Sequence, residues 1–256
     1  MNPLLEAVLL LFAGVFCGFL NTLASSGSAV SLPAMIFLGM DPAVANATNR
    51  LPVLTGAIAA LFTFQRGGGW DWRLAGRLAP PVLAGVVAGA FSAELLPSRE
   101  MGLVITAAVL LALLLLFTKI KSLLADRAPV DIVVSGKIWL ALFGAGFWCG
   151  FIVLDSATYF LLILVLLAGM NMLQANMFKT LFVAMGAFVA LAVFYESHLV
   201  DWKAAGILSA GSLVGGFIGA RMAQIANAKV WVFRLLVTVI LLEVVHLGIK
   251  YLYGLA

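Results

Sequence analysis

Two cations stand at matching places in a strongly apolar sequence. Arg50 follows Asn46 by four residues and Lys179 follows Asn176 by three, so each cation shares a helix face with an asparagine. A buried, unpaired cation is costly and needs a water-filled cavity, an anion or a carboxylate. Snorkelling to lipid headgroups is the alternative, but it does not require the extra amide donor of Asn49. We therefore expect both cations to contact a small anion.

Two polar breaks interrupt the apolar sequence ahead of these cations. Serines fill the first break, between Asn21 and Ser28, and the second break contains Asp155. Polar turns at a membrane surface are one interpretation. We favour a substrate site, because breaks at matching places in two halves mark the substrate site of many transporters. The expected substrate-binding residues are Asn21, Ser25, Ser26, Ser28, Asn46, Asn49, Arg50, Asn176 and Lys179.

Other ionisable groups in apolar segments are candidates for energy coupling. Asp155 can neutralise one of the cations or carry a coupled proton, and Glu243 and His246 are three residues apart, a spacing that lets them touch on a helix. A buried polar pair is the alternative for the latter two. Cys17 and Cys149 occupy matching contexts and suit the role of small packing residues. No metal-ligand cluster or catalytic arrangement has usable spacing, so we expect no metal, cofactor or catalytic residue.

The segments that must position these residues belong to an internal sequence repeat, in which one unit occurs twice. Residues 39–90 recur, shifted by 130 places, as residues 169–220, with about twenty identities in about fifty pairs. The shared residues include an Asp-Trp pair at Asp71 and Asp201 and an Ala-Asn step at Asn46 and Asn176. An internal repeat therefore organises the fold.

Composition indicates that this fold lies in a bilayer. The 256 residues are 64% hydrophobic and 10% charged, with a mean hydropathy of +1.16, which leaves too little polar surface for a water-soluble domain. The net charge of +4 is spread over short loops, which argues against a nucleic-acid partner. Helical segments are predicted at 4–20, 29–39, 43–64, 74–95, 101–118, 138–153, 157–169, 174–194, 204–223 and 230–252.

Five segments per half is an odd number, so the second copy should enter the membrane in the opposite sense. We predict an all-α polytopic membrane protein with two inverted repeats, in each of which the first two segments form a broken or re-entrant hairpin. The repeats span 1–118 and 137–256, joined by a cytoplasmic linker at 119–136. Because cytoplasmic loops concentrate Lys and Arg, we expect the cell (inner) membrane, with both termini on the outer side.

Several of these stretches resemble one known family. The break from Gly18 to Ser28 followed by Pro33, the run from Asp41 to Arg50, and the Gln-Arg-Gly-Gly and Asp-Trp steps at 65–72 look like the sulfite exporter TauE/SafE family, also called toluene sulfonate uptake permeases. Here Ser26-Gly27-Ser28 stands where the family usually has a run of glycines. The resemblance implies a permease for small sulfur-containing or organic anions.

Our leading prediction is a secondary transporter, not an enzyme, that moves sulfite, sulfoacetate or other sulfonates by alternating access between the two halves. The expected partners are a small anionic substrate and the lipid bilayer, with a possible homo-oligomer. Two alternatives remain: an intramembrane enzyme or redox protein using Cys17, Cys149, Asp155 and His246, and a membrane scaffold that transports nothing.

Overall fold

The protein is all-helical. The computed structural model describes residues 3–65, 71–117 and 134–222, so the predicted linker and the predicted last helix lie largely outside the described residues. The helices of the first repeat are α1 (Pro3–Ala24), α2 (Ser28–Phe37), α3 (Pro42–Thr48), α4 (Arg50–Gln65), α5 (Trp72–Glu94) and α6 (Ser98–Phe117). Those of the second are α8 (Gly136–Phe151), α9 (Ser156–Leu162), the π-helical turn η1 (Ile163–Leu167), α10 (Met172–Glu196) and α11 (Trp202–Met222).

Side-chain caps at repeat-equivalent positions start the long helices. Asp71 accepts hydrogen bonds from the second and third amides of α5, at 3.1 and 3.0 Å, and Asp201 does the same for α11, at 3.0 Å each. Asp41 caps α3 in the same way, and Asn171 caps α10 by accepting from the third amide alone, that of Gln174. The first amides of a helix have no partner in the helix, so an Asp or Asn there fixes its start. The Asp-Trp pair that occurs in both repeats therefore marks the start of two equivalent helices, α5 and α11.

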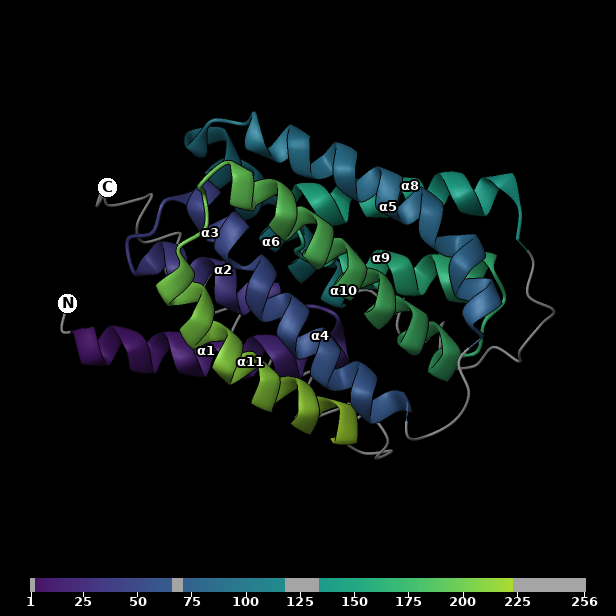
Figure 1. The fold of residues 1–256 in the computed structure, drawn as a ribbon, viewed down its shortest axis with the longest axis horizontal. Helices are drawn as coiled ribbons and strands as arrows, with labels where there is room; N and C mark the ends of the chain where they lie inside the picture. The colour runs from purple at the N-terminus through teal and green to yellow at the C-terminus, as the bar shows by residue number, and fades with distance from the viewer. Residues whose placement is uncertain (1–2, 66–70, 118–133, 223–256) are drawn as a thin grey trace.

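Six of the described helices form two groups of three, and each group mixes the repeats. α1 and α4 pack with α11 of the second repeat, whereas α8 and α10 pack with α5 of the first. Figure 1 shows α1, α4 and α11 on one side of the bundle and α5 and α8 on the other, with α10 between them. The groups meet where α4 packs against α10. Neither repeat is thus a separate domain.

Glycines allow the closest helix contacts in both groups. A Cβ atom at Gly14 or Gly18 of α1 would overlap main-chain oxygens of α11, and one at Gly215 of α11 would overlap the carbonyl oxygen of Val15. The repeat-equivalent pair α8 and α5 has the same design, at Gly146, Gly150, Gly85 and Gly89. Small residues let membrane helices approach closely and gain dispersion energy.

We expect Gly215→Ala to destabilise the protein by about 1–3 kcal/mol, because the added methyl group must push α11 away from α1. The matched control is Gly206→Ala in the same helix, where a Cβ meets nothing within 4 Å. That change should be neutral or stabilising by about 0.5–1 kcal/mol, because glycine is a poor helix former. Denaturant titration in detergent measures both free energies of unfolding. Equal effects of the two variants would contradict this account of the α1–α11 contact.

The first two segments of each repeat contain a break with unusual backbone geometry. Ser25, after α1, has φ 66° and Asp155, after α8, has φ 59°, and the two positions are 130 residues apart, like the rest of the repeat. The helices that follow are short: α2 has 10 residues, which is about 15 Å of helix against a hydrocarbon core of about 30 Å. α9 and η1 together cover 12 residues. Such lengths suit the predicted broken hairpins.

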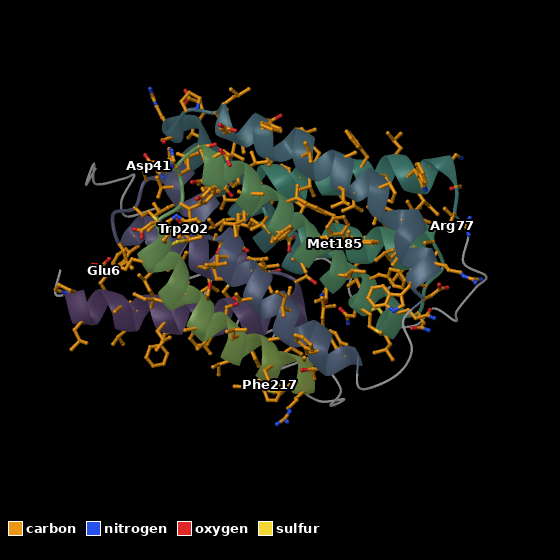
Figure 2. All side chains as sticks on the ribbon, in the orientation of Figure 1. Glu6, Asp41, Arg77, Met185, Trp202 and Phe217 are labelled. Carbon is orange, nitrogen blue, oxygen red and sulfur yellow. The ribbon has the colours of Figure 1, made fainter. Side chains whose placement is uncertain are left out.

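The predicted fold class is confirmed. Among the described residues, four helices are long and apolar enough to cross a membrane: α1 over Pro3–Leu23, α5, α10 and α11. Figure 2 places Glu6 and Asp41 at one end of the bundle and Arg77, in the second turn of α5, at the other, whereas Trp202 at the start of α11 lies toward the Asp41 end. The repeat-equivalent helices α5 and α11 thus start at opposite ends of the bundle. Their inversion across a bilayer stays a prediction, as do the domain boundaries.

Candidate functional site: two buried cations at opposed helix ends

The two polar breaks contact each other in the interior of the bundle. The hydroxyl of Ser26, in the first break, donates to Oδ1 of Asp155, in the second, at 2.9 Å. Thr158, in the first turn of α9, donates to the same oxygen at 2.9 Å. Asp155 is only 4% exposed, so these hydroxyls replace water as partners of the carboxylate. Residues 129 places apart in the chain therefore form one polar centre.

Lys179 brings a cation to the end of α1. Its side chain is 2% exposed, and Nζ donates to the carbonyl oxygen of Asn21 at 3.4 Å and to the hydroxyl of Ser25 at 3.2 Å. The last four carbonyls of a helix have no partner within it, and the helix dipole makes that end negative. Lys179 of the second repeat thus stabilises the carboxyl end of the first helix of the first repeat.

Arg50 likewise stabilises the carboxyl end of the first helix of the second repeat, α8, and does so with more hydrogen-bond donors. The side chain is 0% exposed. Nη1 donates to the carbonyl oxygen of Cys149, and Nη2 lies 3.0 Å from that of Gly150 and 3.2 Å from that of Phe151. These are the last carbonyls of α8. The planar guanidinium satisfies several of them at once, which an ammonium group cannot do with the same geometry.

Two further side chains orient this guanidinium. Asn46 accepts from Nη2 of Arg50 at 3.1 Å and donates to the carbonyl oxygen of Phe151 at 2.9 Å. The ring of Phe194 lies against the guanidinium, with 5.2 Å between Cζ and the ring centroid. Of the described residues, none accepts a hydrogen bond from Nε of Arg50. In this conformation the donors of Arg50 are directed mainly to the main chain of α8.

A second polar cluster ties α2 to the junction of α3 and α4. The side chain of Asn49 donates to the hydroxyl of Ser28 at 3.0 Å and accepts from that of Ser31 at 2.6 Å. Ser31 also contacts the sulfur of Cys17 at 3.4 Å. All four residues are buried. Asn49 therefore links α2, which follows the first break, to α4, the helix that carries Arg50.

A small cavity lies beside Lys179. It has a volume of about 20 Å³, and its lining includes Asn21, Thr22 and Thr180 together with apolar side chains of α4, α9 and α10. This volume has room for about one water molecule. A sulfonate group with its carbon chain is larger, so the cavity would have to widen to hold one.

The structure brings most of the predicted substrate-binding residues together. Asn21 and the three predicted serines lie at the ends of α1 and α2, beside the helices that carry both cations. Asn176 is half-buried one turn before Lys179, and its carbonyl oxygen accepts from Thr180 at 2.7 Å. Glu243 and His246 lie outside the described residues. Whether any of these residues binds an anion stays a prediction.

Several residues of the site were not among the predicted substrate-binding residues: Thr22, Ser31, Thr158, Thr180 and Phe194. A signal existed for two of them. Ser31 stands three residues after Ser28, on the same helix face. Thr158 stands three residues after Asp155, a spacing at which its hydroxyl can donate to the carboxylate.

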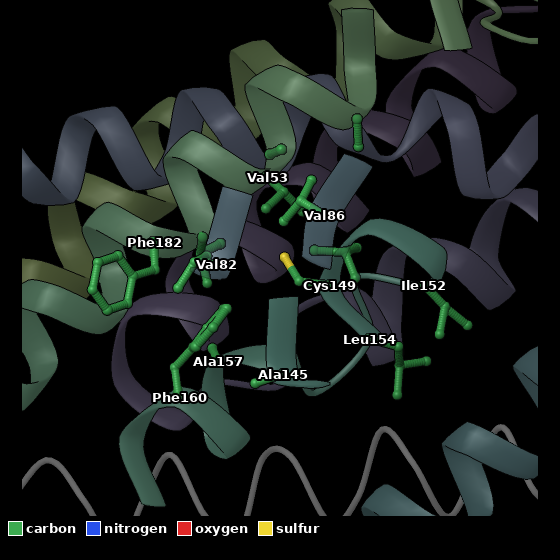
Figure 3. Close-up of a cluster of buried hydrophobic side chains, with 14 of the residues drawn as sticks. Val53, Val82, Val86, Ala145, Cys149, Ile152, Leu154, Ala157, Phe160 and Phe182 are labelled. Carbon is green, nitrogen blue, oxygen red and sulfur yellow. The ribbon is translucent and has the colours of Figure 1, made fainter. Parts of the chain in front are cut away.

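The cysteines fit the packing role predicted for them. Both are fully buried and free of disulfide bonds. Figure 3 shows the Cys149 side chain among apolar neighbours that include Val53, Val82 and Val86. A Cβ at Gly186 would lie 2.9 Å from its sulfur, so the space around it is filled. Among the described residues, no three His, Cys, Asp or Glu side chains group in a way that could hold a metal ion.

Fold and site together define a polytopic helical membrane protein with a buried, cation-lined polar centre between two repeats. The profile of the sulfite exporter TauE/SafE family matches residues 10–247, and the chain belongs to this family. A probable membrane transporter protein, ORF9, of Sinorhizobium sp is 28% identical over 223 residues, which are 86% of this chain and 84% of that protein.

Two further relatives carry similar names. The probable membrane transporter protein YfcA of Escherichia coli K12 is 26% identical over 228 residues, 87% of this chain and 80% of that protein. A probable membrane transporter protein of Haemophilus influenzae is 24% identical over 223 residues, 84% of each chain. No solved structure matches the chain significantly. Family and relatives indicate a multi-pass membrane transporter, in agreement with the class of function that the sequence predicted.

Proposed function

We propose that the protein is a secondary transporter for small organic or sulfur-containing anions such as sulfite and sulfonates. The observation that carries this proposal is the pair of buried cations, Arg50 and Lys179, at the carboxyl ends of repeat-equivalent helices. Cations are rare inside membrane proteins and usually mark a transport pathway. The family name and the names of the relatives point to the same class.

In this proposal the two cations have different tasks. The cavity adjoins Lys179, whose Nζ donates to the hydroxyl of Ser25 at 3.2 Å and to the carbonyl oxygen of Asn21 at 3.4 Å. Arg50 is held by carbonyls, an amide and an aromatic ring. We assign Lys179 and the hydroxyls around it to substrate contact. Arg50 and Asn46 act as positioning residues that hold the end of α8 against the site.

We propose alternating access by motion between the two three-helix groups. Because they meet mainly at α4 and α10, a rocking motion there would open the region beside Lys179 to one side at a time. In the present structure the cavity has room for about one water molecule, so this motion would have to widen it for a sulfonate. Asp155, Glu243 and His246 remain our candidates for coupling. We place the protein in the inner membrane, with the Arg77 end in the cytoplasm and both termini outside.

Uptake of labelled sulfonates and sulfite into proteoliposomes tests the proposal. The wild type should accumulate at least one of these anions above empty vesicles. Lys179→Ala should reduce uptake about 10- to 100-fold, the worth of a charge-assisted hydrogen bond, and Arg50→Ala should also reduce it. A Cys17→Ala/Cys149→Ala variant should transport normally, which would separate a transporter from a thiol-dependent enzyme. Unaltered uptake in both cation variants would reject the site assignment.

A further inference from the structure

The small cavity lies where the two repeats meet. Val53 of α4 and Val183 of α10 both line it, and they are 130 residues apart, the shift that relates the two repeats. Equivalent side chains that line one space place that space near the axis between the repeats. Substrate sites of transporters with inverted repeats lie at this interface. The position of the cavity therefore agrees with a substrate site, independently of the charges around it.

Polar and apolar side chains come to this cavity from different helices. α1 contributes only polar residues and α4 only apolar ones, while α10 contributes both kinds. The polar residues that line it are Asn21, Thr22, Lys179 and Thr180, and the apolar ones are Val53, Ala57, Ala157 and Val183. Each of the four apolar side chains is at most 8% exposed. The cavity thus has an apolar wall, formed by these four side chains, which offers a ligand no hydrogen bond.

An apolar wall discriminates between kinds of anion. An inorganic oxyanion such as sulfate presents oxygens on all sides, so one of them would face Val53 or Ala57 without a hydrogen-bond partner. Burying a polar atom in this way is unfavourable. A sulfonate presents three oxygens on one side and carbon on the other, which matches a cavity with polar residues on α1 and apolar residues on α4.

We infer that the apolar wall receives the carbon substituent of the substrate, so the site selects organic sulfonates with a small substituent over inorganic anions of the same charge. This inference rests on the proposed function and narrows it, because sulfite, which has no carbon substituent, becomes the weaker substrate. Val53, Ala57 and Val183 are then the residues that determine specificity. No part of the inference depends on which groups neutralise Lys179.

Widening of the cavity preserves this wall. Val53 and Val183 lie on α4 and α10, the helices at which the two three-helix groups meet. Motion between these helices would open space between the two valines. Ala57 stands four residues after Val53, on the same face of α4, and would border the same space. The substituent therefore enters between aliphatic side chains of both repeats.

Methanesulfonate and sulfamate provide the test, because they carry the same single charge and differ only in a methyl against an amino group. Their dissociation constants are measured by thermal stabilisation of the full-length protein in detergent. The wild type should bind methanesulfonate at least about tenfold more tightly, since the amino group of sulfamate would lose its hydrogen bonds to water at the apolar wall.

Threonine variants test the wall itself. Val183→Thr adds a hydroxyl at nearly the same shape, so the affinity ratio should move toward sulfamate by about tenfold. Val53→Thr makes the same change at the repeat-equivalent position and should act in the same direction. The matched control is Val109→Thr: Val109 of α6 is also buried but is not among the residues that line the cavity, so the ratio should stay at the wild-type value.

Two results would overturn the inference and leave the proposed function intact. One is equal affinity of the wild type for methanesulfonate and sulfamate. The other is a wild-type affinity ratio in both Val183→Thr and Val53→Thr. Failure of the wild type to bind any sulfonate would instead reject the proposed function.

Discussion

Replacement of Arg50 by glutamine is expected to lower the free energy of unfolding by about 3–5 kcal/mol. The change removes the donors that three carbonyls at the end of α8 share, together with the partner of Asn46 and the cation over the Phe194 ring. Each buried acceptor left without a donor costs about 1–3 kcal/mol. Arg50→Lys should recover only part of the loss, because a single ammonium group cannot reach all these carbonyls.

The chain offers a matched control in Arg221, which also lies over an aromatic ring, with 4.1 Å between its Cζ and the centroid of Phe217. Arg221 is exposed, at the end of α11. Arg221→Gln should therefore change the free energy of unfolding by less than about 1 kcal/mol. Denaturant titration in detergent compares the two. Equal losses would show that the α8 carbonyls do not depend on Arg50.

Asn49→Leu is expected to cost about 2–4 kcal/mol, because it buries the hydroxyls of Ser28 and Ser31 without their shared partner. The two hydrogen bonds, at 3.0 and 2.6 Å, join α2 to the junction of α3 and α4. Their loss should also release the first break from its position, so sulfonate uptake should fall with stability. Thermal unfolding in detergent and uptake into proteoliposomes measure the two effects.

Thr106→Val is the control for this change. It also replaces a polar group within an apolar helix, but the hydroxyl of Thr106 donates to the carbonyl oxygen of Gly102 in its own helix, at 2.9 Å. That carbonyl keeps its place in the helix, so stability should change by no more than about 0.5 kcal/mol. A wild-type unfolding temperature for Asn49→Leu would mean that the cluster around Asn49 contributes little to the packing of α2.

The fold class could be predicted from sequence because a bilayer permits few solutions. Long apolar segments must become helices, since no water is present to satisfy the backbone. Their ends were harder to place. The predicted helix 43–64 is divided at Asn49 into α3 and α4, and the predicted helix 4–20 continues to Ala24. Hydropathy changes gradually along the chain, whereas helix ends are set by individual caps and by the left-handed backbone at Ser25.

The candidate site could be predicted less completely. Repeat-related polar residues pointed to the two breaks, and the structure brings these breaks into contact through Ser26 and Asp155. The main-chain partners of Arg50 and Lys179 could not be foreseen, because every residue has a carbonyl group and only the fold decides which carbonyls lack a partner. The place of Thr180 in the site could not be foreseen either. A hydroxyl in an apolar helix usually donates to a carbonyl oxygen of its own helix, as the hydroxyl of Thr180 also does.

The pairing of α1 with α11 has a consequence for how the chain is made. α1 ends at Ala24 and α11 begins at Trp202, so at about 5–20 residues per second the ribosome needs roughly ten seconds or more to supply the partner of the first helix. Until then, the glycine face of α1 has no complementary surface. Insertion of the second half therefore completes the packing of the first, and a nascent chain released early would present that face to the translocation and quality-control machinery.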